Sequence, residues 1–225
     1  MALSLPGKRQ ISEKTLELNV CAEVLSQMRL IPGYEKAVWQ GLTQMQERSA
    51  GLDELLRNLG PGQFLMLQFK SPWPSSIVDI TYKFSINIQQ HITLEQGPCS
   101  LYPEGVYYVF PLFSTWDKVD SYAPVLANDT WLLRAADIDS ATLGLTQQRH
   151  KVEITRTGGI PRVTVFSPEI DAKVLNLAEV LENPEELIPK ASWVPSEMVM
   201  HWAESVNLDY SEKRLRGLHS IFIPA

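Results

Sequence analysis

The feature that most restricts the fold of this chain is one short apolar segment, Gln63-Phe64-Leu65-Met66-Leu67-Gln68-Phe69-Lys70. Gly62 precedes the segment and Ser71-Pro72 follows it, so residues that break regular structure limit its length on both sides. A short and nearly continuous apolar run is typical of a central strand that is buried on both faces of its sheet. We therefore expect this segment to form the core strand of the protein.

The segments before this strand predict a helix and a hairpin. Residues 11–28 have the pattern of an amphipathic helix capped by the hydroxyl of Ser12, with an apolar stripe formed by Leu18, Cys21, Leu25 and Met28. Residues 37–48 show a less regular pattern. Residues 52–57 taken alone have the composition of a helix, but the turn at 58–62 and the strand beyond it favour a β-hairpin.

The segments after the strand complete an α/β pattern. We expect strands at 78–86, 106–113 and 131–134, a short helix at 88–94, a hairpin that pairs 151–157 with 162–166, and a helix from Ser167 to about Leu181. The order helix, strands, helix, strand predicts an α/β protein with a central mixed β-sheet flanked by helices.

The chain is expected to form an α/β core at residues 1–140 and a C-terminal hairpin-plus-helix extension at 141–225 that packs on the core. Residues 183–225 are irregular and rich in proline, apart from a helical piece near 196–206. Together with Trp193 and Trp202, this C-terminal third favours a surface for a protein partner.

The composition limits the classes of function. A chain of 225 residues with 44% hydrophobic and 20% charged residues suits one elaborated globular domain, and no apolar run approaches the roughly 18 residues that span a bilayer. The two cysteines, Cys21 and Cys99, are expected as free thiols, and the N-terminus lacks a signal-peptide pattern, which favours a cytoplasmic protein. The net charge of −6 argues against binding nucleic acid through bulk electrostatics, so such contact is expected only from a local patch.

A set of polar residues accompanies the core strand, with Asp53 before it and Gln68 and Lys70 at its end. Because residues two apart on a strand face the same side, Gln68 and Lys70 are expected to point together toward whatever Asp53 offers from an adjacent strand. Hydrolysis of a phosphodiester requires a divalent cation held by carboxylate oxygens and a positive group near the attacking water or the phosphate. The carbonyl of Phe69, between the two side chains, is a neutral candidate ligand.

The acid-bearing helix, the Gly51-Leu52-Asp53 element, the turn and the strand ending Gln68-Phe69-Lys70 together resemble the PD-(D/E)xK nuclease superfamily in its Gln-x-Lys variant. The resemblance covers about residues 11–135. It implies a restriction-endonuclease-like core of order αβββαβ, with Mg²⁺ or Mn²⁺ bound by Asp53, Gln68 beside the metal and Lys70 as the catalytic cation.

The same resemblance implies further site residues on the helices. A second metal-binding acid is expected on the first helix, with Glu17 as the first candidate and Glu13 as the second, and Glu47 is an alternative ligand. Gln90 and His91 lie on the helix expected to follow the core strands, where nuclease-like folds sometimes place an auxiliary group.

Two features depart from the family pattern: no proline precedes Asp53, and Gln68 replaces a carboxylate by a neutral amide, which binds Mg²⁺ more weakly. Three interpretations therefore remain open. The first is a metal-dependent nuclease acting on DNA or RNA. The second is a nuclease-fold module with a depleted acid set, used as a recognition or scaffold subunit in a larger complex. The third is a hydrolase or transferase of another class, which no motif favours.

Overall fold

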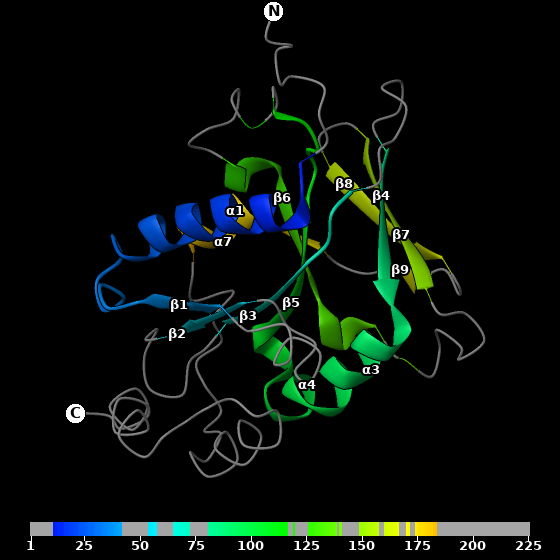
Figure 1. The fold of residues 1–225 in the computed structure, drawn as a ribbon, viewed down its shortest axis with the longest axis horizontal. Helices are drawn as coiled ribbons and strands as arrows, with labels where there is room; N and C mark the ends of the chain where they lie inside the picture. Colours follow the sequence, from blue (N-terminus) through cyan, green and yellow to red (C-terminus); the bar gives the residue numbers. More distant parts are fainter. Residues whose placement is uncertain are drawn as a thin grey trace, which may run out of the picture.

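The structure, a computed structural model, contains two β-sheets with helices packed against them (Figure 1). It describes residues 11–41, 54–57, 65–72, 81–116, 119, 126–138, 140, 149–157, 160–166, 170–171 and 174–183. The first sheet has six strands in the order β1-β2-β3-β5-β6-β10, and the second has four in the order β4-β7-β8-β9. The prediction of an α/β protein with a mixed sheet flanked by helices is confirmed.

The first sheet is built around β3 (Leu65–Phe69) and β5 (Val106–Pro111), which are parallel neighbours. On one side, β1 (Val38–Gly41), β2 (Glu54–Arg57) and β3 form an antiparallel meander, in which Glu54 pairs with Leu67. On the other side, β6 (Thr130–Arg134) and β10 (Val174–Asn176) continue the sheet, each antiparallel to its neighbour. All residues of β3 and β5 are buried, as expected for central strands covered on both faces.

Helices α1 (Glu13–Met28) and α7 (Leu177–Glu182) cover one face of this sheet. The hydroxyl of Ser12 accepts from the backbone N–H of Thr15, so the predicted N-cap is confirmed. The predicted apolar stripe is wrong in part, because Leu18 is 58% exposed. Cys21 and Met28 of the expected stripe are buried. The buried residues of α1 are Leu16, Glu17, Val20, Cys21, Val24 and Met28.

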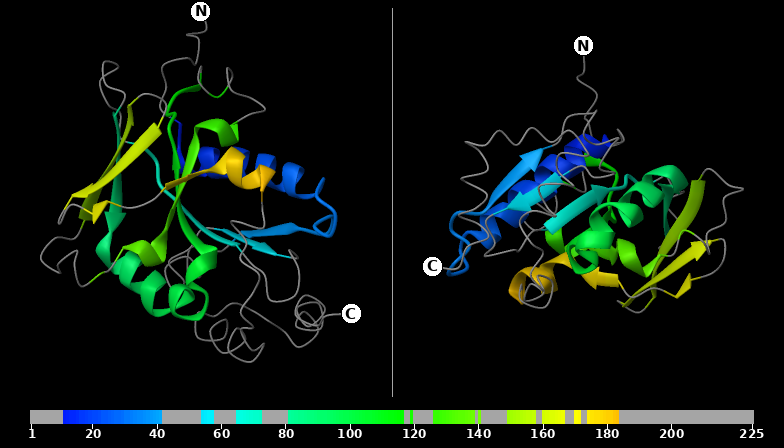
Figure 2. Two further views of the ribbon diagram at one scale, coloured as in Figure 1. Left: turned by 180° about the vertical axis from the view of Figure 1, so that it is seen from behind. Right: turned by 90° about the horizontal axis from the view of Figure 1, so that it is seen from below.

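The second sheet and α3 (Ile88–Gln96) lie against the other face (Figure 2). β4 (Thr81–Asn87) pairs with β7 (Arg149–Thr157), which pairs with β8 (Ile160–Phe166), and β9 (Ile170–Asp171) follows at the edge. The ring of Phe84 in β4 meets the ring of Phe110 in β5 edge-on, with centroids 4.8 Å apart. This contact joins the two sheets.

The strands and helices of the first 140 residues follow the predictions with two differences. The hairpin preferred for residues 52–57 is confirmed by the antiparallel pairing of β2 with β3. The strand β1, in contrast, forms where the sequence pattern is less regular and predicted no element. The strand expected at 78–86 is present as β4, but it belongs to the second sheet and not to the first. The short elements α4 (Pro98–Leu101), η2 (Pro103–Gly105), η3 (Leu126–Asp129) and η4 (Ala135–Asp137) connect the others.

Beyond residue 140, the predicted hairpin is confirmed by the pairing of β7 with β8. The helix predicted from Ser167 to Leu181 is wrong, because Val174–Asn176 is a strand and the helix begins only at Leu177, where Asn176 caps it. The β-branched Val174 fits a strand, and β6 offers it an edge to pair with. The helical piece expected near 196–206 lies outside the described residues.

Two smaller expectations concern the cysteines and the membrane. Cys21 and Cys99 are buried free thiols, as predicted. Burial raises the pKa of the Cys99 thiol to about 12, with the nearby Glu95 carboxylate as a smaller cause. Within the described part of the chain, no helix has the length and apolar character needed to cross a bilayer.

Candidate functional site

The candidate site lies where β3 ends. Gln68 is the fourth residue of β3, and Lys70 follows the strand directly, with its backbone N–H donating to the carbonyl of Val109 at 3.0 Å. Both side chains are almost fully buried, at 1% and 8% exposure. The apolar residues Leu65, Leu67 and Phe69 of β3 belong to the core under α1, so Gln68 and Lys70 point to the opposite face, toward α3.

Gln90, in the first turn of α3, joins these two side chains in one network. The ammonium of Lys70 donates to Oε1 of Gln90 at 2.8 Å, and Nε2 of Gln90 donates to Oε1 of Gln68 at 2.6 Å. Nε2 of Gln68 donates in turn to the carbonyl of Phe69 at 3.2 Å. Of the predicted site residues, the structure therefore brings Gln68, Lys70 and Gln90 together.

The lysine dictates how both amides are oriented. An ammonium group carries only donors, so the oxygen of Gln90 must face Lys70 and its amide nitrogen must face the other way. That nitrogen needs an acceptor, which fixes the oxygen of Gln68 toward Gln90. The network is therefore a directional chain whose orientation begins at the positive charge of Lys70.

Tyr108 and His91 lie beneath this network and belong to the core. The ring centroid of Tyr108 is 5.8 Å from Nζ of Lys70, close enough for a cation–π interaction. Nε2 of His91 lies 2.9 Å from the carbonyl of Ile138, and Nδ1 lies 2.9 Å from the hydroxyl of Tyr108. Because a carbonyl only accepts, Nε2 carries the proton and Nδ1 accepts from Tyr108 in neutral histidine. Burial raises the pKa of Tyr108 well above its usual value, which keeps that hydroxyl a donor.

His91 was predicted as an auxiliary site residue. In the structure it contacts Tyr108, whose ring lies beside Lys70, and it bonds none of Lys70, Gln68 and Gln90 among the described hydrogen bonds. It is fully buried, and both of its ring nitrogens have core partners. Its connection to Lys70 runs through the Tyr108 ring. Sequence reasoning did not single out Tyr108, although it pairs directly with Gln68 across β3 and β5.

The first helix brings Glu13 to the end of β3. Oε2 of Glu13 accepts from the backbone N–H of Ser71 at 2.7 Å, so the first turn of α1 touches the residue after Lys70. Glu17, one turn further, is buried at 4% exposure and forms an ion pair with Lys14. The other predicted acids, Asp53 and Glu47, lie outside the described residues.

The described donors fit a divalent cation only in part. Glu13 contributes one carboxylate at the strand end, and Gln68 and Phe69 contribute neutral oxygens. No group of three His, Cys, Asp or Glu side chains within the described ranges is arranged to hold a metal ion. A metal site at this position therefore needs at least one further carboxylate, and the candidates Asp53 and Glu47 lie outside the described residues.

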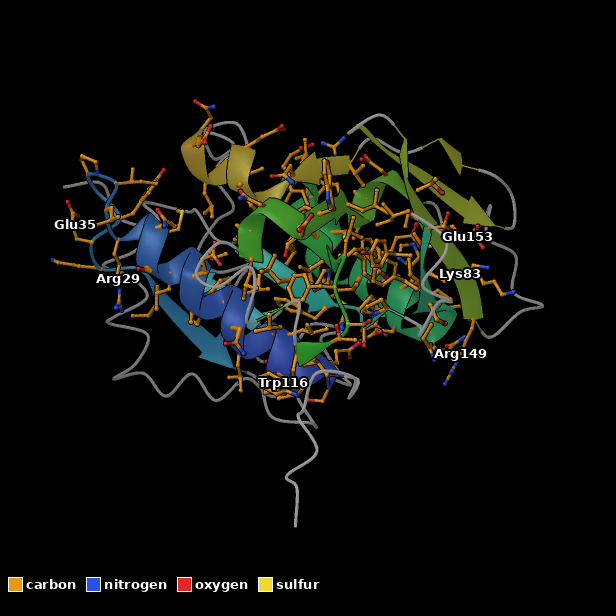
Figure 3. The ribbon with its side chains drawn as sticks, turned by 90° about the horizontal axis from the view of Figure 1, so that it is seen from above. Arg29, Glu35, Lys83, Trp116, Arg149 and Glu153 are labelled. Atoms are coloured by element: carbon orange, nitrogen blue, oxygen red, sulfur yellow. The ribbon has the colours of Figure 1, made fainter. Side chains whose placement is uncertain are left out.

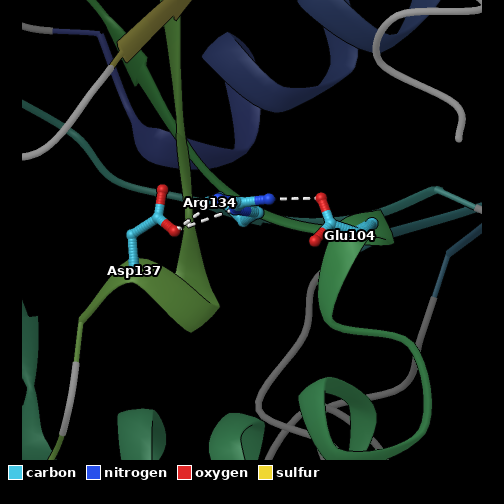
Figure 4. A network of polar contacts seen from close by, with 3 residues as sticks. All are labelled: Glu104, Arg134 and Asp137. Atoms are coloured by element: carbon cyan, nitrogen blue, oxygen red, sulfur yellow. Dashed lines mark hydrogen bonds and ion pairs between the residues drawn. The ribbon is translucent and has the colours of Figure 1, made fainter.

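Another polar cluster, away from this site, is an ion-pair network and not a second centre. Arg134 at the end of β6 bonds Asp137 through Nε at 2.9 Å and through Nη2 at 2.8 Å, and its Nη1 bonds Glu104 (Figure 4). These two carboxylates raise the pKa of Arg134, with the hydrogen bond that Arg134 donates to Asp137 as the largest cause. Asp137 thus fastens η4 to β6.

Comparison with known proteins gives no match: no family model, no curated protein and no solved structure is significantly similar to this chain.

Proposed function

We propose that this chain is a metal-dependent, nuclease-like protein that hydrolyses phosphodiester bonds of nucleic acid, and that about residues 11–135 form a restriction-endonuclease-like core. The order of elements supports this proposal. α1 precedes the meander β1-β2-β3, and α3 lies in the connection that returns to β5, parallel to β3. Helix, three strands, helix and strand then follow one another as in an αβββαβ core, with β4 as an addition that pairs in the second sheet.

The observation that carries the proposal is the lysine held at the end of β3 between two helix N-termini. Gln90 in the first turn of α3 contacts Lys70, and Glu13 in the first turn of α1 contacts Ser71. Helix N-termini carry partial positive charge, so together with the ammonium they favour a negatively charged group at this point. Ligands of α/β proteins also tend to bind beyond the carboxyl ends of parallel strands, which is where this site lies.

In the proposed site, Asp53 and one acid from Glu13, Glu17 and Glu47 hold Mg²⁺ or Mn²⁺. When bound, the metal supplies a water of lowered pKa and offsets the charge of the phosphate. Lys70 donates to a phosphate oxygen and stabilises the negative charge that develops there. Gln90 fixes the position of the Lys70 ammonium, and Gln68 keeps the amide of Gln90 in the orientation that this requires.

Replacing Lys70 tests the proposal. Lys70→Ala is expected to abolish metal-dependent cleavage, because it removes the ammonium group that Gln90 holds at the end of β3. Lys70→Met keeps the packing of the apolar stem over Tyr108 and should be equally inactive, which separates loss of charge from loss of packing. Cleavage of a fluorescent single strand and of a duplex, with Mg²⁺, Mn²⁺ or EDTA, measures the effect, and circular dichroism checks the fold.

Gln90→Ala is the second arm of that experiment, with Gln89→Ala as its matched control. Gln89 is exposed in the same helical turn, whereas it is the side chain of Gln90 that bonds Lys70. We expect Gln90→Ala to slow cleavage roughly tenfold to a hundredfold by releasing the ammonium, and Gln89→Ala to leave it unchanged. Full activity in both Lys70 variants would refute the mechanism.

A catalytically depleted module is the second candidate, and the neutral Gln68 in place of a carboxylate favours it. In that case the same fold recognises a partner within a larger complex and cuts nothing. Titration calorimetry with Mn²⁺ distinguishes the two candidates: binding that Asp53→Asn abolishes supports the nuclease, whereas absence of binding, or binding that this variant leaves intact, supports the module.

A further inference from the structure

The outer face of the second sheet carries exposed positive charge. Along β7, the residues Arg149, Lys151, Glu153 and Thr155 alternate with the buried Val152 and Ile154. Their Cα partners on β4 are Asn87, Ser85, Lys83 and Thr81, and these alternate with the buried Phe84 and Ile86. One face of the β4–β7 pair is thus apolar and packed inward, while the other is polar and open to solvent. We call the latter the outer face.

The charge on the outer face is opposite in sign to that of the whole chain. Its described residues include the cations Lys83, Arg149 and Lys151, all exposed, and a single acid, Glu153. The chain as a whole carries a net charge of −6. Lys83 lies 3.5 Å from Glu153, so this pair is partly neutralised, whereas Arg149 and Lys151 face the neutral side chains of Asn87 and Ser85.

The outer face ends at the candidate site. Arg149 pairs with Asn87, the last residue of β4, and Asn87 caps the helix α3 through the backbone N–H groups of Gln89 and Gln90. Gln90 is the residue that holds Lys70. Figure 3 shows Lys83, Arg149 and Glu153 together at one end of the molecule, opposite the end that carries Arg29 and Glu35.

We propose that the outer face of β4 and β7 binds the phosphate backbone of the nucleic acid on which the Lys70 site acts. This builds on the proposed function, which supplies the substrate class. A polyanion is the occupant because the cations are spaced along a strand, two residues apart, and hydroxyl groups lie among them. The bound strand continues from Lys70 past Arg149 to Lys151 and Lys83. The outer face thereby gives an acidic protein a local, positively charged surface that binds its substrate.

The test measures binding without cleavage, by fluorescence anisotropy of labelled single-stranded and duplex oligonucleotides in EDTA over a series of salt concentrations. The double variant Arg149→Glu/Lys151→Glu is expected to bind at least roughly tenfold more weakly and to reduce the slope of log K against log salt by about two. Lys36→Glu makes the same kind of charge change on an exposed residue beside Glu35, at the opposite end, and should bind like the unmodified chain.

Two further variants sharpen the result. Arg149→Gln/Lys151→Gln removes the cations without adding acids beside Glu153, and it should show the same direction of change if the reversed variant folds poorly. Glu153→Gln removes the only acid on the described outer face, and it should bind about two- to fivefold more tightly.

The outcomes separate this inference from the proposed function. Lys70→Ala is expected to retain binding while losing cleavage. If neither the unmodified chain nor any variant cleaves, but the outer-face variants lose binding, the nuclease proposal fails and the outer face remains a nucleic-acid binding surface. Unchanged binding in both double variants would refute the binding of nucleic acid by the outer face, as would preferential binding of anionic lipid vesicles over either oligonucleotide.

Discussion

At the scale of single residues, the clearest sequence signal for the candidate site is Gln68, a polar side chain in an apolar strand. A buried amide must find hydrogen-bond partners, and Gln68 finds one in Gln90, twenty-two positions away in the sequence. Lys70, predicted beside it, is buried with its ammonium on Gln90 and near the face of Tyr108. The meeting of these groups was predicted for Gln68 and Lys70, but the directional chain through Gln90 was not, because it depends on where α3 docks.

Glu23 gives a prediction at the same scale. Its carboxylate accepts from the backbone N–H groups of Leu126 and Ala127, and it is partly buried between α1 and η3. Burial raises the pKa of this carboxyl above 4.5, more than the two hydrogen bonds lower it. A raised pKa in the folded state means that folding favours the protonated form, so the contribution of Glu23 to stability is largest below pH 4.5 and decreases as the pH rises through the raised value.

Urea unfolding at a series of pH values measures this dependence against Glu23→Gln, which stays neutral throughout. The free energy of unfolding of the unmodified chain, minus that of the variant, should fall as the pH increases above 4.5. A difference that rises with pH would show that the hydrogen bonds to Leu126 and Ala127 outweigh the cost of burial.

At the scale of elements, the N-cap of α3 connects stability with the candidate site. Oδ1 of Asn87 accepts from the N–H groups of Gln89 at 2.9 Å and Gln90 at 3.1 Å. Asn87→Ala is expected to lower the free energy of unfolding by about 1 kcal/mol, the usual cost of losing an N-cap. It should also slow cleavage, because the turn that carries Gln90 loses its anchor.

Asn19→Ala is the control for this prediction. Asn19 is exposed within α1 and bonds only its own helix, at the carbonyl of Thr15 among the described contacts, so the change should stay within about 0.5 kcal/mol. Chemical unfolding followed by circular dichroism compares the two variants. Equal stability of both would mean that Asn87 does not anchor α3.

At the scale of the whole molecule, the two sheets are joined through buried aromatic contacts. Phe84 of the second sheet and Phe110 of the first are 1% and 0% exposed, and their rings touch. β10 also returns from beyond residue 140 to pair with β6 in the first sheet. We therefore expect the two sheets to unfold as one cooperative unit.

Phe84→Ala tests this cooperativity. Removal of a buried phenyl ring should cost about 3–5 kcal/mol. Neither β4 nor residues 132–192 contain tryptophan, so tryptophan fluorescence reports on other parts of the chain, including Trp39 in β1 and Trp131 in β6. Fluorescence and far-UV circular dichroism should shift to lower denaturant together. A fluorescence transition that stays at the same denaturant concentration would show that the sheets unfold independently. Val38→Ala, at a 37% exposed position, is the control and should move neither signal appreciably.

The sequence alone determined those features that depend on neighbours along the chain. The nearly continuous apolar runs predicted β3 and β5, Ser12 predicted the start of α1, and the segments 151–157 and 162–166 predicted the pairing of β7 with β8. In each case local periodicity, capping or turn chemistry is sufficient, because it acts within a few residues.

Only the tertiary structure decided which strands share a sheet and which polar groups meet. β4 joins β7, more than sixty residues away, and Val174–Asn176 becomes a strand because β6 presents an edge to it. Glu13 reaches Ser71, fifty-eight positions away in the sequence, because α1 packs on the sheet with its first turn at the end of β3. Pairing and docking depend on contacts between distant segments, and the pattern of a single segment records only which of its faces is apolar.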